Sequence, residues 1–258
     1  MKHTIKSNEP EINYYNFIHK TSWSSYFPKL YKSGISYVLP YTRSMELEYI
    51  PGPTMSDIYL EGLLSPEIFS NFLDLIDRLH SSDVSDEVIV TLDDIKSFYL
   101  DKLSERRKYI CNDFSDHDDV LNDLTTNLYT YVSKLKDSDV TNIIHGDLWF
   151  PNIILSKGNM KFVDMRGHIG SKITVKGDRL YDYAKIYQSL IGMDNILRYG
   201  ERKQMDNIID IFQNRYNNHM NNIRLLSAYT IYCSFFSWTL KQEQKNNLWI
   251  IIKELLHH

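Results

Sequence analysis

Cysteine is scarce in this chain of 258 residues, which contains only Cys111 and Cys233. Two cysteines that lie so far apart argue against a disulfide framework and against a zinc site built from cysteine pairs. They are typical of buried, reduced thiols, and such thiols favour a cytoplasmic location.

Long apolar segments and an excess of positive charge are also missing. Residues 1–15 hold no continuous apolar stretch, so we expect no secretory signal there. The longest apolar run near the C-terminus, residues 248–256, is too short to span a bilayer. The net charge of -4 gives no electrostatic reason to expect nucleic acid or an anionic membrane as a partner. A phosphorylated small ligand stays compatible with it, since that needs only local positive charge.

The elements that the sequence predicts divide the chain into two parts. After a short helical stretch at 11–19, residues 35–39 and 45–50 alternate or run apolar like strands. The segment Pro51-Gly52-Pro53 then interrupts regular structure. We therefore predict an α+β fold with a small mixed part, 1–50, and a larger helical part, 51–258. The expected helices of the larger part cover 66–80, 91–111 and 119–135, with more from 178 onward.

A hairpin is expected inside the helical part. Two short apolar runs, 153–155 and 160–163, flank a turn of sequence SKGN. Because a hairpin folds back on itself, Asn152 and Asp164 should lie at the same end of the ladder. Asp147 precedes the first strand in the loop that enters the hairpin. The three polar side chains can therefore converge.

These side chains suit phosphoryl transfer. Asn152 and Asp164 offer the oxygen ligands that Mg²⁺ prefers, alongside phosphate oxygens and water. Asp147 is left free to accept the proton of a hydroxyl group, with little covalent chemistry for the protein to do. The H-x-D-x-x-x-x-N spacing matches a kinase catalytic loop, in which His145 would be structural. Taken singly, Asp147 and Asn152 could instead be turn formers.

A resemblance to a known group rests on several spaced motifs. The segments HGDLWFPNIIL, KFVDMRG and GDRLYDYAKIYQSL look like the aminoglycoside phosphotransferase and choline kinase group, with MELEYIPGPT similar to its hinge and LIDRLHSS to the helix that follows. The likeness covers roughly residues 35–195. It implies a protein-kinase-like fold with a reduced N-terminal lobe and a large, mostly helical C-terminal lobe that contains a catalytic hairpin.

The same resemblance assigns expected roles. Asp147 would be the catalytic base, and Asn152 and Asp164 would bind Mg²⁺. The backbone of Glu48, Tyr49 and Ile50 would hold the adenine of ATP. Asp182 resembles a buried residue that braces the catalytic loop.

The sequence also departs from the pattern of that group. Glycine is scarce before the hinge: Gly34 is the only one ahead of Gly52, so no glycine-rich loop covers the phosphates. The usual lysine and its glutamate partner are not evident, although Lys2 or Lys6 could pair with Glu9 or Glu11. One alternative is that a partner chain completes the small lobe.

The sequence leaves two possible roles for each of two further residues. Trp149 could line a pocket for a quaternary ammonium or pack the loop, and Arg166 could hold a phosphate or pair with a carboxylate.

We predict a kinase that moves the γ-phosphoryl group of ATP, or of another nucleoside triphosphate, to a hydroxyl of a sugar, polyol or amino alcohol. The alternatives are a pseudokinase or nucleotide-binding regulatory module, and an aminoglycoside-inactivating phosphotransferase.

Overall fold

In the computed structural model, residues 8–35, 43–110, 117–235 and 239–257 are described. The first part contains helix α1 (Glu9–Ile18), the short helix η1 (Ser22–Tyr26) and an antiparallel pair of strands, β1 (Leu30–Ile35) and β2 (Arg43–Leu47). The predicted strand at 45–50 thus begins two residues earlier and ends at Leu47. The strand predicted at 35–39 lies, apart from Ile35, outside the described residues.

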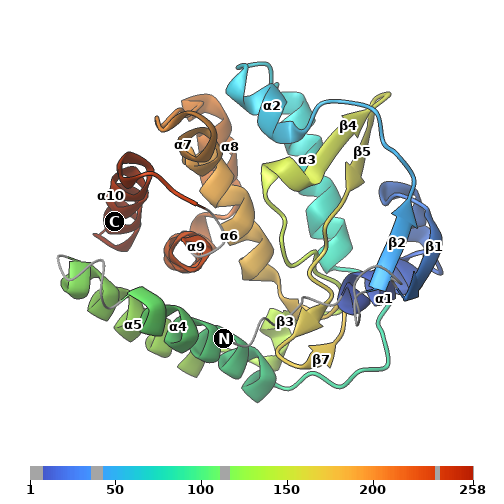
Figure 1. The fold of residues 1–258 in the computed structure, drawn as a ribbon, viewed down its shortest axis with the longest axis horizontal. Helices are drawn as coiled ribbons and strands as arrows, with labels where there is room; N and C mark the ends of the chain where they lie inside the picture. Colours follow the sequence, from blue (N-terminus) through green and yellow to red (C-terminus); the bar gives the residue numbers. More distant parts are fainter. Residues whose placement is uncertain (1–7, 36–42, 111–116, 236–238, 258) are drawn as a thin grey trace.

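The larger part is mainly helical, as predicted (Figure 1). Its helices are α2 (Met55–Leu60), α3 (Pro66–His80), α4 (Leu92–Ile110), α5 (Asp118–Ser133), α6 (Arg179–Leu190), α7 (Met193–Tyr199), α8 (Asp206–Arg215), α9 (Met220–Ser234) and α10 (Gln242–His257), with short helices η3 (Asp137–Asp139), η4 (Phe150–Asn152) and η5 (Asn217–His219). The helices predicted at 66–80, 91–111 and 119–135 correspond to α3, α4 and α5. The α+β fold class is confirmed.

Local sequence explains where α3 begins and which face it buries. The Ser65 hydroxyl accepts a hydrogen bond from the backbone N–H of Ile68, and Pro66 occupies the first turn. Both features are typical of a helix N-terminus. The apolar residues that recur at helical spacing are buried, and Phe69 and Phe72 are fully buried among them.

The predicted hairpin is present as strands β4 (Ile153–Ser156) and β5 (Asn159–Phe162), which pair Ile153 with Phe162 and Ser156 with Asn159. In Figure 1 it lies between the β1–β2 pair with α1 and the helices around α6. Two shorter ladders are formed by the strands β3 (Val140–Thr141), β6 (His168–Ile169), β7 (Lys172–Ile173) and β8 (Gly177–Asp178): β3 pairs with β8 and β6 with β7.

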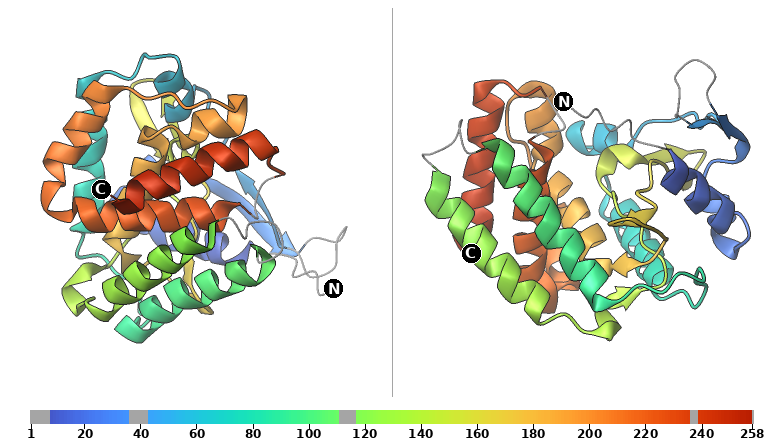
Figure 2. Two further views of the ribbon diagram at one scale, coloured as in Figure 1. Left: turned by 90° about the vertical axis from the view of Figure 1, so that its left-hand side faces the viewer. Right: turned by 60° about the horizontal axis from the view of Figure 1, so that its bottom comes forward.

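Helix α6 is buried along its whole length, from Leu180 to Leu190. It packs against α9, which in turn packs against α10, while α4 and α5 lie side by side and close the same bundle (Figure 2). Asp178 caps α6: its carboxylate accepts from the N–H of Leu180 and from the hydroxyls of Tyr99 and Tyr131. Among the described residues, no helix is both long and apolar enough to cross a membrane.

Candidate active site

The loop that precedes the hairpin is fixed by one buried carboxylate. Asp182 on α6 accepts hydrogen bonds from the backbone N–H groups of His145 and Gly146, each at 2.7 Å. It also contacts Nε2 of His80 at 3.0 Å. Burial works to raise the pKa of Asp182, but the hydrogen bond and charge of His80 outweigh it and hold that pKa below its usual value. These are the contacts of a bracing residue, and the role stays a prediction.

His145 is buried beneath the same loop. Its Nδ1 accepts from the N–H of Asp147 at 3.2 Å, and its ring packs edge-on against Phe162 of β5. Burial lowers the pKa of His145, although the charges of Asp182, Asp147 and Asp164 work in the opposite direction. A neutral, buried imidazole of this kind suits the structural role expected for His145, which is likewise still a prediction.

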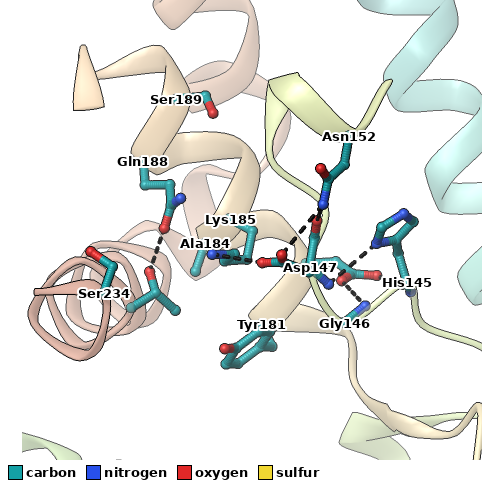
Figure 3. Close-up of polar contacts among 12 residues, drawn as sticks. His145, Gly146, Asp147, Asn152, Tyr181, Ala184, Lys185, Gln188, Ser189 and Ser234 are labelled. Carbon is teal, nitrogen blue, oxygen red and sulfur yellow. Dashed lines mark hydrogen bonds and ion pairs between the residues drawn. The ribbon is translucent and has the colours of Figure 1, made fainter. Parts of the chain in front are cut away.

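Asp147 is held from two sides (Figure 3). The amide nitrogen of Asn152 donates to the carbonyl of Asp147 at 2.9 Å and to its carboxylate at 3.3 Å. On the other side, Nζ of Lys185 lies 2.8 Å from the carboxylate. Burial alone would raise the pKa of Asp147, yet the charge and hydrogen bond of Lys185 lower it below its usual value. The carboxylate is therefore ionised at neutral pH and ready to accept a hydrogen bond.

Sequence reasoning missed Lys185. Its Nζ also lies 5.6 Å from the centre of the Trp149 ring, within the range of a cation–π contact. A signal was present in the sequence, because Lys185 follows Asp182 by three residues and so shares its helix face. Because Asp182 is expected to contact the loop, a lysine on the same face of that helix should also lie against the loop.

The expected metal ligands lie at one end of the hairpin, as the ladder requires. The N–H of Val163 donates to the carbonyl of Asn152 at 3.0 Å, and Asp164 follows with a left-handed φ of 61°. Asp164 is close enough to Glu11 of α1 to raise its pKa, which burial and that charge together bring to about 7. Asn152 offers an amide oxygen and Asp164 a carboxylate, which are the kinds of ligand that Mg²⁺ prefers, so these two residues fit that ion.

No group of three or more His, Cys, Asp or Glu side chains forms a metal site within the part of the chain that the structure describes. The pair of Asn152 and Asp164 would therefore need phosphate oxygens and water to complete a magnesium shell, as is usual for this ion. Lys2 and Lys6, the candidate phosphate contacts, lie outside the described residues.

The segment expected to hold adenine follows β2 directly. The N–H of Glu48 donates to the carbonyl of Lys29 at 2.8 Å, which extends the β1–β2 ladder by one bond. Tyr49 is 86% exposed and Ile50 is half-buried. Beyond them, Pro53 accepts from the N–H of Leu155 at 2.9 Å, so the hinge is joined to the hairpin. The structure thus joins the end of this segment to the β4–β5 hairpin.

Arg166 packs over the loop that precedes the hairpin. Its N–H donates to the carbonyl of His145 at 3.1 Å, and its Nε donates to the carbonyl of His168 at 3.0 Å. The guanidinium carbon lies 4.3 Å from the ring centre of Phe98 and 4.6 Å from that of Tyr181. Its Nη1 is buried and has no hydrogen-bond partner among the described residues. Arg166 forms no ion pair with a described carboxylate.

Comparison with known proteins supports the fold. No family model and no curated protein matches the chain. Among solved structures, the choline/ethanolamine kinase family protein from Mesorhizobium loti aligns with a TM-score of 0.63 at 11% identity, over 97% of this chain and 80% of that chain. The choline kinase LicA from Streptococcus pneumoniae aligns with a TM-score of 0.59 at 13% identity, over 98% and 82%. LicA has also been solved in complex with AMP.

A second group of matches consists of aminoglycoside phosphotransferases. A thermostable mutant of the aminoglycoside phosphotransferase APH(4)-Ia, in a ternary complex with ADP and hygromycin B, aligns with a TM-score of 0.64 at 12% identity, over 94% of this chain and 81% of that chain. The chain therefore has the protein-kinase-like fold of small-molecule phosphotransferases, and the fold that the sequence resemblance implied is confirmed.

Proposed function

We propose that the protein is a magnesium-dependent kinase that moves the γ-phosphoryl group of a nucleoside triphosphate to a hydroxyl of a small molecule. One observation carries the proposal: Asp147 is held by Lys185 and Asn152 at the end of the hairpin where Asp164 also lies. The neighbours in fold that were solved with ADP or AMP support the use of a nucleotide.

Each residue has a task in this reaction. Asp147 accepts a hydrogen bond from the acceptor hydroxyl and takes its proton as the bond to phosphorus forms. Asn152 and Asp164 would hold Mg²⁺, which when bound neutralises charge on the phosphates. The backbone of Glu48, Tyr49 and Ile50 receives the adenine. Lys185 keeps Asp147 ionised and oriented, and Asp182 keeps the loop in place.

Replacement of Asp147 by asparagine tests the proposal. The protein is incubated with γ-labelled ATP, Mg²⁺ and a panel of sugars, polyols, amino alcohols and aminoglycosides, and labelled products are separated. We expect transfer by the parent and a loss of about 10²–10⁴-fold in the variant, since general-base assistance has that worth. Asp137→Asn, at an exposed position of η3, is the matched control.

The outcome also separates the alternatives. Binding of Mg·ATP without transfer to any acceptor would indicate a pseudokinase or a nucleotide-binding regulatory module. Transfer confined to aminoglycosides would indicate a drug-inactivating enzyme. Retention of the parent rate by Asp147→Asn would remove Asp147 from the role of base. A cytoplasmic location and a partner chain that completes the small lobe remain predictions.

A further inference from the structure

Three cations from three separate segments gather beside the proposed base, and we call them the acceptor-side cations: Lys102, Arg166 and Lys185. Lys185 pairs with Asp147. Nζ of Lys102, on α4, lies 3.4 Å from the hydroxyl of Tyr181, and the Arg166 guanidinium lies 4.6 Å from the centre of the same ring. Tyr181 is one helical turn before Lys185, and Figure 3 shows both on the same side of Asp147.

These cations exceed the negative charge that faces them. Lys102 and Arg166 form no ion pair with a carboxylate of the described residues; their contacts are a hydroxyl, carbonyl oxygens and aromatic rings. Asp147 is the carboxylate with which Lys185 forms its ion pair. The chain as a whole has a net charge of -4, so a local excess of positive charge here runs against its overall balance.

The positive region extends to α9. Burial raises the pKa of the Cys233 thiol, while the charges of Lys102, Arg106 and Lys185 all act to lower it. The charge of Asp194 also acts on Lys185. Burial raises the pKa of Asp194 to about 6, so this carboxyl is mostly ionised at pH 7, and Asp147 and Asp194 together supply two negative charges against the three acceptor-side cations. Asp101 and Glu105 on α4 are exposed to solvent.

The same arrangement works against a cationic acceptor. In a choline-type site, an aromatic face receives the ligand's ammonium group. Here Lys185 already lies over the face of Trp149, so the protein's own cation takes that position. A ligand ammonium a few ångströms from the reacting hydroxyl would also meet the charge of Lys185, and like charges at that range repel.

We propose that the acceptor is a small alcohol that carries an anionic group, either a carboxylate or a phosphate. This inference rests on the proposed kinase function and specifies its substrate class. The hydroxyl lies at Asp147, and the anionic group lies against Lys102 and Arg166, where the buried Nη1 of Arg166 supplies an unused donor. Guanidinium and ammonium groups bind both kinds of anion through charge-assisted hydrogen bonds.

Two series of acceptors with matched skeletons test the charge preference. The first is glycerate, glycerol and 2-amino-1,3-propanediol, with glycerol 3-phosphate added to distinguish phosphate from carboxylate. The second is glucuronate, glucose and glucosamine. With Mg·ATP and a coupled assay of ADP release, we expect kcat/KM for the best anion to exceed that for its neutral partner by about tenfold or more, since one charge-assisted contact has that worth. Equal or faster turnover of the amines would overturn the inference.

Lys102→Met tests the assignment to this surface. We expect it to lower kcat/KM for the anion by about tenfold and to leave that for the neutral alcohol within a factor of two. Lys96→Met is the matched control, because Lys96 lies on the same helix and pairs with exposed Asp93 at 3.8 Å. Equal effects of the two substitutions would contradict the assignment.

The inference and the kinase proposal fail in different ways. Transfer to neutral or cationic acceptors alone leaves the kinase intact and refutes the anionic acceptor. If none of the seven probes is phosphorylated, direct binding of glucuronate and glycerol 3-phosphate is measured by NMR at millimolar concentration. Binding that Lys102→Met abolishes and Lys96→Met retains supports the inference, and absence of binding refutes it.

Discussion

At the scale of single residues, the proposed base depends on a partner from a distant part of the chain. Asp147 and Asn152 could be found from their spacing because the loop that joins them is local. The pair of Asp147 and Lys185 spans 38 positions and exists only because α6 packs beneath the loop. Arg166 could be named as a possible phosphate contact, but its stacking on Phe98 could not, since that requires α4 to be placed.

Replacement of Lys185 by methionine should measure how much the ion pair with Asp147 contributes to the free energy of unfolding. At pH 7 we expect a loss of about 1–2 kcal/mol in the free energy of unfolding, less than for a fully buried pair because the Asp147 side chain is 36% exposed. The pKa of Asp147 is lowered in the folded parent, so its contribution is present above the unfolded pKa and is lost as pH falls through the folded value. The difference between variant and parent should therefore shrink below about pH 4.

Urea unfolding at several pH values measures this difference. Lys185→Arg keeps the positive charge and serves as the control, with an expected loss that depends little on pH. A methionine variant whose deficit stays constant from pH 7 to pH 3 would mean that lost packing, and not lost charge, explains it.

At the scale of elements, the hairpin was predictable and the short ladders were not. Two apolar runs around a glycine-containing turn specify β4 and β5 from neighbouring residues alone. The two-residue pairing of Val140 with Asp178 joins segments 38 positions apart, and no local pattern encodes it. The same holds for the bond between Pro53 and Leu155, by which the hinge meets the hairpin.

Gly52→Ala should weaken that junction. A Cβ atom at this position would lie 2.1 Å from the carbonyl oxygen of Leu155, and the φ of 144° is one that alanine rarely adopts. We expect a loss of roughly 1–3 kcal/mol in stability, together with weaker nucleotide binding, because the hinge must move away from β4. Urea unfolding and calorimetric titration of Mg·ATP measure the two effects.

Gly34→Ala in β1 provides the comparison. A Cβ atom there would meet nothing within 4 Å, so we expect a change of less than about 0.5 kcal/mol. If both alanine variants behaved alike, the close approach of Gly52 to Leu155 would have no energetic weight.

At the scale of the whole molecule, the order of motifs was sufficient to predict the fold class, because each motif belongs to one place in a kinase-like fold. How the two parts pack could not be read in this way. Phe27, which follows η1, contacts Phe162 of the hairpin with ring centres 5.6 Å apart, and its carbonyl accepts from Lys161. Apolar residues on both sides of the predicted boundary at 50/51 thus belong to one hydrophobic cluster. The boundary itself stays a prediction.

Phe27→Ala should therefore lower the stability of the whole chain. Phe27 is fully buried, and removal of such a side chain costs about 3–5 kcal/mol. We expect far-UV circular dichroism and hydrogen exchange in α6 to report the same shifted midpoint, since one cooperative unit unfolds. Tyr31→Ala, at a position 67% exposed, is the control. Unchanged protection of α6 in Phe27→Ala would show that the first part unfolds independently.

The acceptor-side cations also bear on the end of each catalytic cycle. Phosphorylation gives the acceptor about 1.5 to 2 further negative charges at neutral pH. Lys102, Arg166 and Lys185 would then hold the product more firmly than the molecule from which it was made. Escape of the phosphorylated product, and not phosphoryl transfer, would set the pace of turnover, and accumulated product would inhibit the enzyme at concentrations well below the KM of its acceptor.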